Sequence, residues 1–425
     1  MTATDVLVGD VSTTRSARAY RLPIALASFG VLSLVVFGLL GSSGSTTTFG
    51  VSTSTDFFTI DPIRLPSQLT ATVLSVLALL LAAYSFLRVR QGLRVGTWVP
   101  VLFGVLWVFT FLVWAVTDKS TSLVSLLQGS LLLAVPLAFG ALGGLLNERA
   151  GVVNIAIEGQ LLLGAFGAAV FGSVTGNAYL GLVAAPVAGL LIGSLLALFT
   201  VKYSVNQIIV GVVLNVLAVG LTSFLFSSVL KDNAATLNSP PRLSTLPIPL
   251  LSEIPVIGPV LFRQSIIVYL LYVAVAVIAV ALFRTRWGLR VRAVGEHPQA
   301  ADTVGINVNR TRWGNVLLGS AVAGLGGAFF TLGSVGAFGQ EMTAGKGYIA
   351  LAAMILGRWS PVGALGAALL FGFADKLQQV LGVLETPIPN QFMLMLPYLV
   401  TIFAVAGLVG RVRGPAAAGE PYVKG

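Results

Sequence analysis

Two stretches of this chain place polar side chains inside long apolar runs. In ALGGLLNERAGVVNIAIEGQLLLGAFGAA, Asn154 and Glu158 are four residues apart and would share one face of a helix. An ionisable side chain such as Glu158 is costly inside an apolar span, so by default it marks an interior position or a water-filled path. A structural hydrogen bond to a neighbouring helix is the alternative role for this carboxylate.

The second stretch, GSVGAFGQEMTAGKGYIALAAMILGRWSPVGALGAALLFGFADKLQ, is interrupted by glycines. Gly345 and Gly347 precede a short apolar segment at about 348–356, and Pro361 follows it. Two interrupted segments in different halves of a membrane chain indicate a binding path at the interface of inverted repeats. The path residues that we predict are polar or aromatic: Asn154, Glu158, Asn206, Gln207, Asn215, Phe338 and Glu341. Hydrogen bonds across helices stay open as the role of the amides, and packing stays open for Phe338.

The composition is that of a protein embedded in a bilayer. The 425 residues are 56% hydrophobic and only 9% charged, whereas a soluble domain has roughly 25% charged residues. At roughly 20 apolar residues per span, this length allows about twelve transmembrane helices and no large soluble domain. We therefore predict an all-α membrane protein, a polytopic helical bundle that crosses the cytoplasmic membrane many times.

Several chemistries are excluded by what the chain lacks. It has no cysteine and one histidine, His297, which removes disulfides, thiolate catalysis and metal sites built from several such residues. The net charge of +10 comes from Lys and Arg between apolar spans, so nucleic acid is not an expected partner. No G-x-x-x-x-G-K-[ST] loop is present to bind nucleotide phosphates. We predict no catalytic residue, metal or cofactor in this chain.

The apolar runs and the basic residues between them predict a topology. Twelve runs lie at about 22–40, 69–87, 98–116, 123–146, 155–174, 180–201, 208–230, 266–283, 315–332, 348–356, 362–380 and 392–408. The tenth run is too short for an ordinary span and is a candidate broken or re-entrant segment. On this topology, eighteen of the 25 Lys and Arg residues share one side. The positive-inside rule makes that side cytoplasmic and places both termini there.

The longest inward loop, RTRWGLRVRAVGEHPQAADTVGINVNRTRWG, contains a predicted helix at 298–304. Pro298 suits the first position of a helix, and Gly305 suits the position just past its end. A helix of about two turns is unstable alone, so it must lean on the rest of the chain or on a partner. Small and charged residues offer such a partner a close approach and ion pairing: Ala300, Ala301, Glu296 and Asp302. A surface helix at the lipid headgroups is the alternative.

Here the residues carry a resemblance to a known family. The run RAVGEHPQAADTVGIN resembles the coupling-helix segment of ABC transporter permeases of the branched-chain amino acid, ribose and nucleoside superfamily. The runs NERAGVVNIAIEGQLLLGAF, VNQIIVGVVLN and EMTAGKGYIALAAMILGRWSPVGALGAALLFGFAD are similar to segments of its nucleoside permeases, often described as simple-sugar permeases. The resemblance covers about 123–408.

The resemblance implies an architecture and a coupling mechanism. A ten-helix permease core would occupy 122–410. An N-terminal extension at 1–121 with about three helices would precede it and add a hairpin. The Gly, Pro and Ala content of 411–425 predicts a disordered cytoplasmic tail. The coupling segment would seat in a groove of an ATPase subunit and transmit ATP-driven motion through Glu296, Pro298, Ala300, Ala301, Asp302 and Gly305. The chain itself would not be an enzyme.

The resemblance also implies partners and a substrate class. The partners would be a second related permease, an ATPase subunit that uses ATP, and an extracytoplasmic substrate-binding lipoprotein. The function would be import of nucleosides, with ribose or another simple sugar as the alternative substrate. A different class is an ion-coupled secondary transporter in which Glu158 and Asp375 are the ion-linked carboxylates.

Overall fold

Apolar helices make up most of the structure. The computed structural model describes residues 20–384, 391–392, 395 and 413–423. Within these residues, nine helices are long and apolar enough to cross a membrane, which confirms the predicted polytopic helical membrane protein. Helix α14 (Lys346–Leu356) has 11 residues and is only about 17 Å long. It is therefore too short to span a bilayer, while the twelfth predicted run at 392–408 lies outside the described residues.

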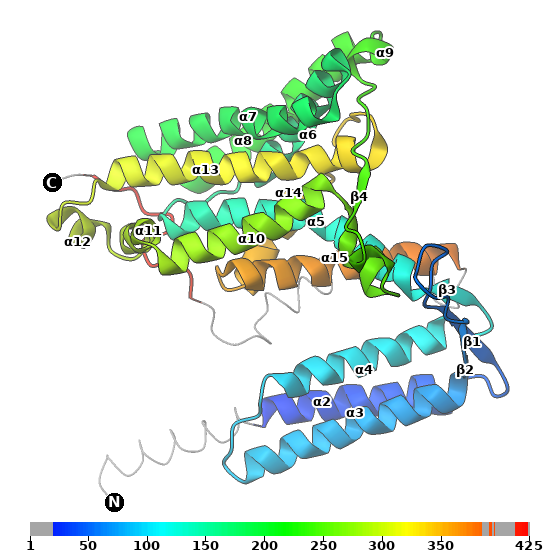
Figure 1. The fold of residues 1–425 in the computed structure, drawn as a ribbon. Helices are drawn as coiled ribbons and strands as arrows, with labels where there is room; N and C mark the ends of the chain where they lie inside the picture. Colours follow the sequence, from blue (N-terminus) through cyan, green and yellow to red (C-terminus); the bar gives the residue numbers. More distant parts are fainter. Residues whose placement is uncertain (1–19, 385–390, 393–394, 396–412, 424–425) are drawn as a thin grey trace, which may run out of the picture. The chain divides into compact units, whose positions relative to one another are not determined.

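The described residues divide into two units. The first contains residues 20–54, 58–124 and 380–384, and the second contains 55–57, 125–379 and the later described residues. In the first unit three helices run side by side (Figure 1). They are α2 (Arg21–Ser33) with its continuation η1 (Leu34–Leu39), α3 (Ser67–Arg90) and α4 (Trp98–Ala115).

Small side chains explain why these three helices pack closely. The buried positions of α3 recur every three or four residues and are all small: Ser67, Ala71, Ser75, Ala78, Ala82 and Ser85. Such a stripe lets neighbouring helices approach one another, and the Ser33 and Ser75 hydroxyls are 2.8 Å apart across it. A three-stranded sheet joins the helix ends, with β1 (Thr46–Gly50) antiparallel to β2 (Ile63–Pro66) and parallel to β3 (Ser120–Ser122).

The second unit is built around α5 (Leu123–Arg149). Around it lie α6 (Ile157–Thr175), α7 (Ala178–Ala197) with η2 (Leu198–Lys202), α8 (Gln207–Leu225) with η3 (Phe226–Leu230), and α10 (Ile266–Arg284). The later helices are α11 (Arg286–Glu296), α12 (Pro298–Thr303), α13 (Val308–Ala328) with η6 (Phe329–Val335), α14 and α15 (Pro361–Val383). Between α8 and α10 are α9 (Ala234–Leu237), β4 (Thr245–Pro247), η4 (Leu251–Glu253), η5 (Gly258–Phe262) and β5 (Arg263–Ser265), with β4 and β5 antiparallel.

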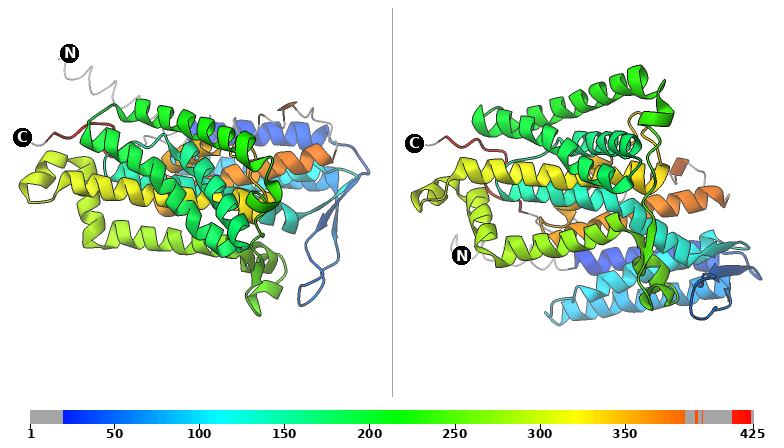
Figure 2. Two further views of the ribbon diagram at one scale, coloured as in Figure 1. Left: turned by 90° about the horizontal axis from the view of Figure 1, so that it is seen from above. Right: turned by 45° about the horizontal axis from the view of Figure 1, so that its top comes forward.

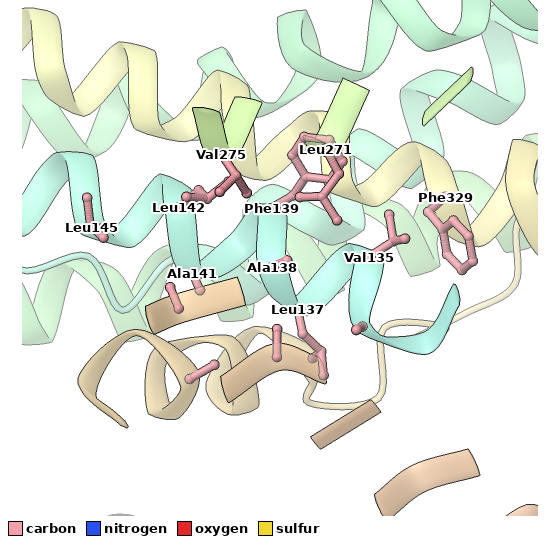
Figure 3. Packing of buried hydrophobic residues seen from close by; sticks show 14 of the residues in the cluster. Val135, Leu137, Ala138, Phe139, Ala141, Leu142, Leu145, Leu271, Val275 and Phe329 are labelled. Carbon is pink, nitrogen blue, oxygen red and sulfur yellow. The ribbon is translucent and has the colours of Figure 1, made fainter. Parts of the chain in front are cut away.

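The core of the second unit is apolar on all sides of α5. Figure 3 shows Phe139 and Leu142 of α5 beside Leu271 and Val275 of α10, while Leu137 points to the opposite side of α5. Helices α6, α7 and α13 lie side by side in Figures 1 and 2. Their backbones meet at glycines, because a Cβ on Gly324 would lie 2.7 Å from the Ala185 carbonyl oxygen and 2.8 Å from Gly189 Cα. This tight packing fixes where α6 begins, and α6 carries Glu158.

Candidate functional site

Glu158 of α6 accepts hydrogen bonds from the beginning of α14. Its Oε1 accepts from the Thr343 hydroxyl at 2.6 Å and from the Gly345 amide at 2.8 Å, and its Oε2 accepts from the Gly347 amide at 2.5 Å. The residue is 7% exposed. A buried carboxylate thus receives three donors, and the free N–H groups at the start of α14 receive an acceptor.

The second break is the glycine-containing run 343–347 at the beginning of α14, and its local sequence makes this contact possible. Gly345 precedes α14 with a φ of +78°, a conformation that other residues adopt only with strain. Gly347 lies so close to Glu158 that a Cβ there would collide with the backbone of that residue. The positive end of the α14 dipole further favours the carboxylate. The T-A-G-K-G run therefore forms an anion-binding helix start that Glu158 occupies.

An ion pair also holds the beginning of α14. Lys346 of α14 pairs with Asp375 of α15, and both side chains are largely buried. The beginning of α14 is thus tied to α6 through Glu158 and to α15 through Asp375. A helix too short to span the bilayer is fixed at the end where its backbone donors would otherwise be unpaired.

The first break is the segment 150–156 between α5 and α6. It is held by side-chain hydrogen bonds. The Gln207 side-chain oxygen accepts from the Val153 amide at 2.6 Å. Asn154 accepts from the Ala156 amide at 3.0 Å and donates to Gln160, which donates to the Ser320 hydroxyl of α13 at 2.9 Å. Asn154, Gln160 and Ser320 are fully buried. These amides supply the hydrogen bonds that the interrupted backbone lacks.

Asn215 of α8 joins the two breaks. Its side-chain oxygen accepts from the Gly159 amide at 2.8 Å, and its nitrogen donates to the Ile155 carbonyl at 2.9 Å. The same nitrogen is 3.1 Å from the Tyr348 hydroxyl on α14. Tyr348 is 48% exposed, so about half of this residue is accessible although its hydroxyl is held in place.

We call the contacts of Asn154, Glu158, Gln207 and Asn215 with the two breaks the junction. The remaining predicted path residues lie apart from this junction or are buried. Asn206 is exposed and caps α8, accepting from the Ile208 and Ile209 amides. Phe338 is buried and packs edge-on against Phe166 at 5.2 Å between ring centroids. Its backbone amide donates to the Asn238 side-chain oxygen, and its carbonyl accepts from the Asn238 side-chain nitrogen. Glu341 is exposed in the turn before α14.

Sequence reasoning missed several residues of the junction, among them Gln160, Ser320, Thr343 and Tyr348. Thr343 and Tyr348 flank the two glycines of the second break, so the T-A-G-K-G-Y run carried a usable signal. Ser320 carried none, because a serine in a glycine-rich helix is ordinary for close helix packing. In the part of the chain that the structure describes, no three His, Asp or Glu side chains gather as metal ligands would.

The end of α5 is tied to the turn between α14 and α15. The Glu148 carboxylate accepts from the Trp359 indole nitrogen at 2.6 Å. The Arg149 guanidinium donates to the Trp359 backbone carbonyl, at 2.9 Å from Nη2 and 3.1 Å from Nε. The N-E-R run that precedes the first break therefore holds the far end of α14, and both ends of this short helix contact residues beside that break.

The inward loop folds as α11, α12 and the start of α13. Pro298 is the first residue of α12, and Gly305 follows the helix with a φ of +84°. Ala300 faces outward, whereas Ala301 is 3% exposed and packs with Val294 and Val308. Of the two small residues, only Ala300 is therefore available to another protein.

The family of the chain follows from its sequence match. Residues 126–405 match the family described as the permease component of the branched-chain amino acid transport system. The chain belongs to this permease family. The match begins beside the boundary between the two units and includes both breaks and α12. No solved structure matches the permease.

Three curated relatives are permease proteins of ABC transporters. The guanosine ABC transporter permease protein NupQ of Bacillus subtilis is 41% identical over 309 residues, covering 71% of this permease and 97% of NupQ. The nucleoside ABC transporter permease protein NupC of Lactococcus lactis is 40% identical over 305 residues, covering 69% and 95%. A second guanosine ABC transporter permease protein of B. subtilis, NupP, is 28% identical over 281 residues, covering 62% and 78%. Two such chains thus occur in one organism.

Removing the Glu158 carboxylate is expected to destabilise the permease. In Glu158→Ala, the Thr343 hydroxyl and two backbone amides lose their acceptor in a buried site, which costs about 2–4 kcal/mol. The thermal unfolding midpoint of the detergent-solubilised protein should fall clearly. The matched change Glu341→Ala removes an exposed carboxylate in the turn just before α14 and should leave the midpoint unchanged. Equal midpoints for the two variants would contradict the assignment.

Proposed function

We propose that this chain is the transmembrane subunit of an ABC importer that carries nucleosides across the cytoplasmic membrane, driven by ATP hydrolysis in a separate subunit. The observation that carries the proposal is the similarity to NupQ and NupC, which extends over nearly the whole length of both relatives. The chain has no phosphate-binding loop of its own. Energy for uphill transport must then enter through a partner.

The junction around Glu158 suits a solute with a flat base and hydroxyl groups. Tyr348 offers an aromatic face whose hydroxyl is fixed by Asn215, and a rigid aromatic stacks well on a base. Asn154, Glu158, Gln207 and Asn215 brace the walls of the path and keep Tyr348 in position. Exposed Asn206, Glu341 and the covered Phe338 belong to the same path in other conformations of the cycle.

The topology that fits this function has twelve helices with both termini in the cytoplasm. The family's ten-helix core would occupy 122–410. The N-terminal extension at 1–121 adds a hairpin to that core. On this topology α12 lies on the cytoplasmic side, where an ATPase can reach it.

Helix α12 is the element through which the ATPase acts. Its outward surface combines exposed Ala300 with Val304, which is 74% exposed and apolar. A small residue beside an exposed apolar one gives a partner a close, dehydrated contact. Glu296, Pro298, Asp302 and Gly305 set the shape and charge of this surface.

The complete importer contains further subunits. A second related permease completes the pathway, in keeping with the two guanosine permease proteins of B. subtilis. An ATPase subunit and an extracytoplasmic substrate-binding lipoprotein complete the assembly. No cofactor is needed in the permease itself.

Uptake assays test the substrate and the energy source together. Cells that contain the complete system should accumulate labelled adenosine but not labelled ribose, and deletion of this chain should abolish the uptake. An uncoupler used while ATP is maintained should leave uptake intact, because no ion gradient drives it. Uptake of ribose alone would favour the sugar permease, and loss of uptake with the uncoupler would favour an ion-coupled transporter.

Tyr348 tests the position of the path. Tyr348→Ala should raise the KM for adenosine uptake about tenfold, since a base–aromatic stack contributes about 1–3 kcal/mol. Tyr179 is the matched control, because it is a similarly exposed tyrosine, 50%, in the first turn of α7. Tyr179→Ala should keep the parental KM. An unchanged KM in Tyr348→Ala would remove this residue from the path.

Ala300 tests the docking surface. Ala300→Arg adds a bulky charge to the outward face of α12 and should reduce co-purification of the ATPase and uptake by at least about tenfold. Ala301 is unsuitable for this test, because an arginine there would disrupt the buried contacts of α12. The control Ala235→Arg changes an exposed alanine in the short helix α9. Co-purification that survives Ala300→Arg would refute the docking role.

A further inference from the structure

The segment 413–423 packs against the elements around α12. The Ala417 amide donates to the Gly295 carbonyl at 2.9 Å, and the Ala416 amide donates to the Glu296 carboxylate at 3.2 Å. Both acceptors lie at the end of α11. The sequence predicts a disordered tail at 411–425, whereas the described part of that tail makes specific backbone contacts.

Tyr422 anchors one end of this segment on α12. Its ring is buried with Val294, Ala301 and Val308. Its hydroxyl bonds to Asp302, and burial together with this bond raises the pKa of Tyr422 above its usual value. A tyrosine hydroxyl is protonated near neutral pH in any case, so it can donate to the Asp302 side chain.

Arg312 anchors the segment on α13. Its Nη1 donates to the Glu420 carbonyl at 2.7 Å, and the residue is 2% exposed. Among the described residues its Nε and Nη2 have no hydrogen-bond partner. An enclosed guanidinium with so few partners is costly, so the bond to Glu420 is worth more here than at a surface. Loss of the segment would leave Arg312 without this acceptor.

The same segment also contacts the break between α5 and α6. Gly151 has a φ of +87°, and a Cβ there would lie 2.9 Å from Arg312 Nη2 and 3.3 Å from the Ala417 carbonyl oxygen. A Cβ on Gly419 would lie 3.6 Å from a methyl group of Val153. The segment is therefore packed directly against the backbone that leads to Asn154 and Glu158.

We propose that residues 414–423 form a strap that transmits displacement of α12 to the break between α5 and α6, with Tyr422 and Arg312 as its positioning residues. This inference rests on the proposed function, since it needs an ATPase that moves α12. The strap is short and is bonded at both ends, so a shift of α12 pulls on backbone that is packed beside Gly151. The strap thus adds a contact to the covalent path through α13 and to the direct packing of Gly295 against Arg149.

Coupling, rather than assembly, is the quantity to measure. The complete importer would be purified and reconstituted into liposomes, and adenosine uptake per ATP hydrolysed would be compared for the parent, Tyr422→Ala, Tyr422→Phe and Val423→Ala. Tyr422→Ala should lower uptake per ATP about tenfold with the ATPase still bound, in the range of measured coupling effects. Tyr422→Phe keeps the buried ring, loses the bond to Asp302 and should show an intermediate loss. Val423 is 77% exposed, so Val423→Ala should match the parent.

Each result bears on the strap. Parental uptake per ATP in both Tyr422 variants refutes it. If Tyr422→Ala fails to assemble, Tyr422→Phe decides: reduced uptake per ATP in an intact complex supports the strap, and full coupling assigns Tyr422 a structural role and refutes it. A parental importer without ATP-dependent adenosine uptake refutes the proposed function and the strap with it, which separates that failure from failure of the strap alone.

Discussion

A helix that begins inside a membrane protein leaves backbone N–H groups without partners, and this constraint shapes the second unit. Each unpaired group costs several kcal/mol where water is scarce. Helix α14 meets the constraint through Glu158, whose two oxygens accept from Thr343, Gly345 and Gly347. The carboxylate in turn needs these donors to be tolerated in a buried position. Neither half of the contact is stable without the other, so the contact fixes α6 and α14 together.

The polar residues of the junction therefore do mainly structural work in this conformation. Asn154, Gln207 and Asn215 complete hydrogen bonds that the interrupted helix between α5 and α6 cannot make within its own backbone. A braced junction of this kind leaves Tyr348 about half exposed. Rigid walls with one exposed aromatic suit a pathway that must recognise a solute and then release it, because strong polar contacts to the solute would slow its exit.

The inward elements follow the same logic of mutual support. Helix α12 has six residues, and such a helix is unstable by itself in water. It is held by Val294, Val308 and Tyr422, which cluster with its Ala301. This support lets α12 present Ala300 outward as a firm surface. A partner that pushes on a firm element moves the helices behind it, whereas a partner that pushes on a loose one would only deform it.

The sequence by itself determined the class of the protein, the apolar spans, the two breaks and the short helix after Pro298. These features depend on local composition, on glycine and proline positions, and on motifs that resemble a permease family. The tertiary structure decided which groups satisfy one another. The three donors to Glu158 are 185, 187 and 189 residues away in the chain, and no local pattern records a pairing at that separation. Likewise, Ala301 is buried because Tyr422, from a distant segment, packs with it, whereas Ala300 stays exposed. The described part of the tail is held because Arg312 donates to Glu420. Packing depends on neighbours in space rather than in sequence.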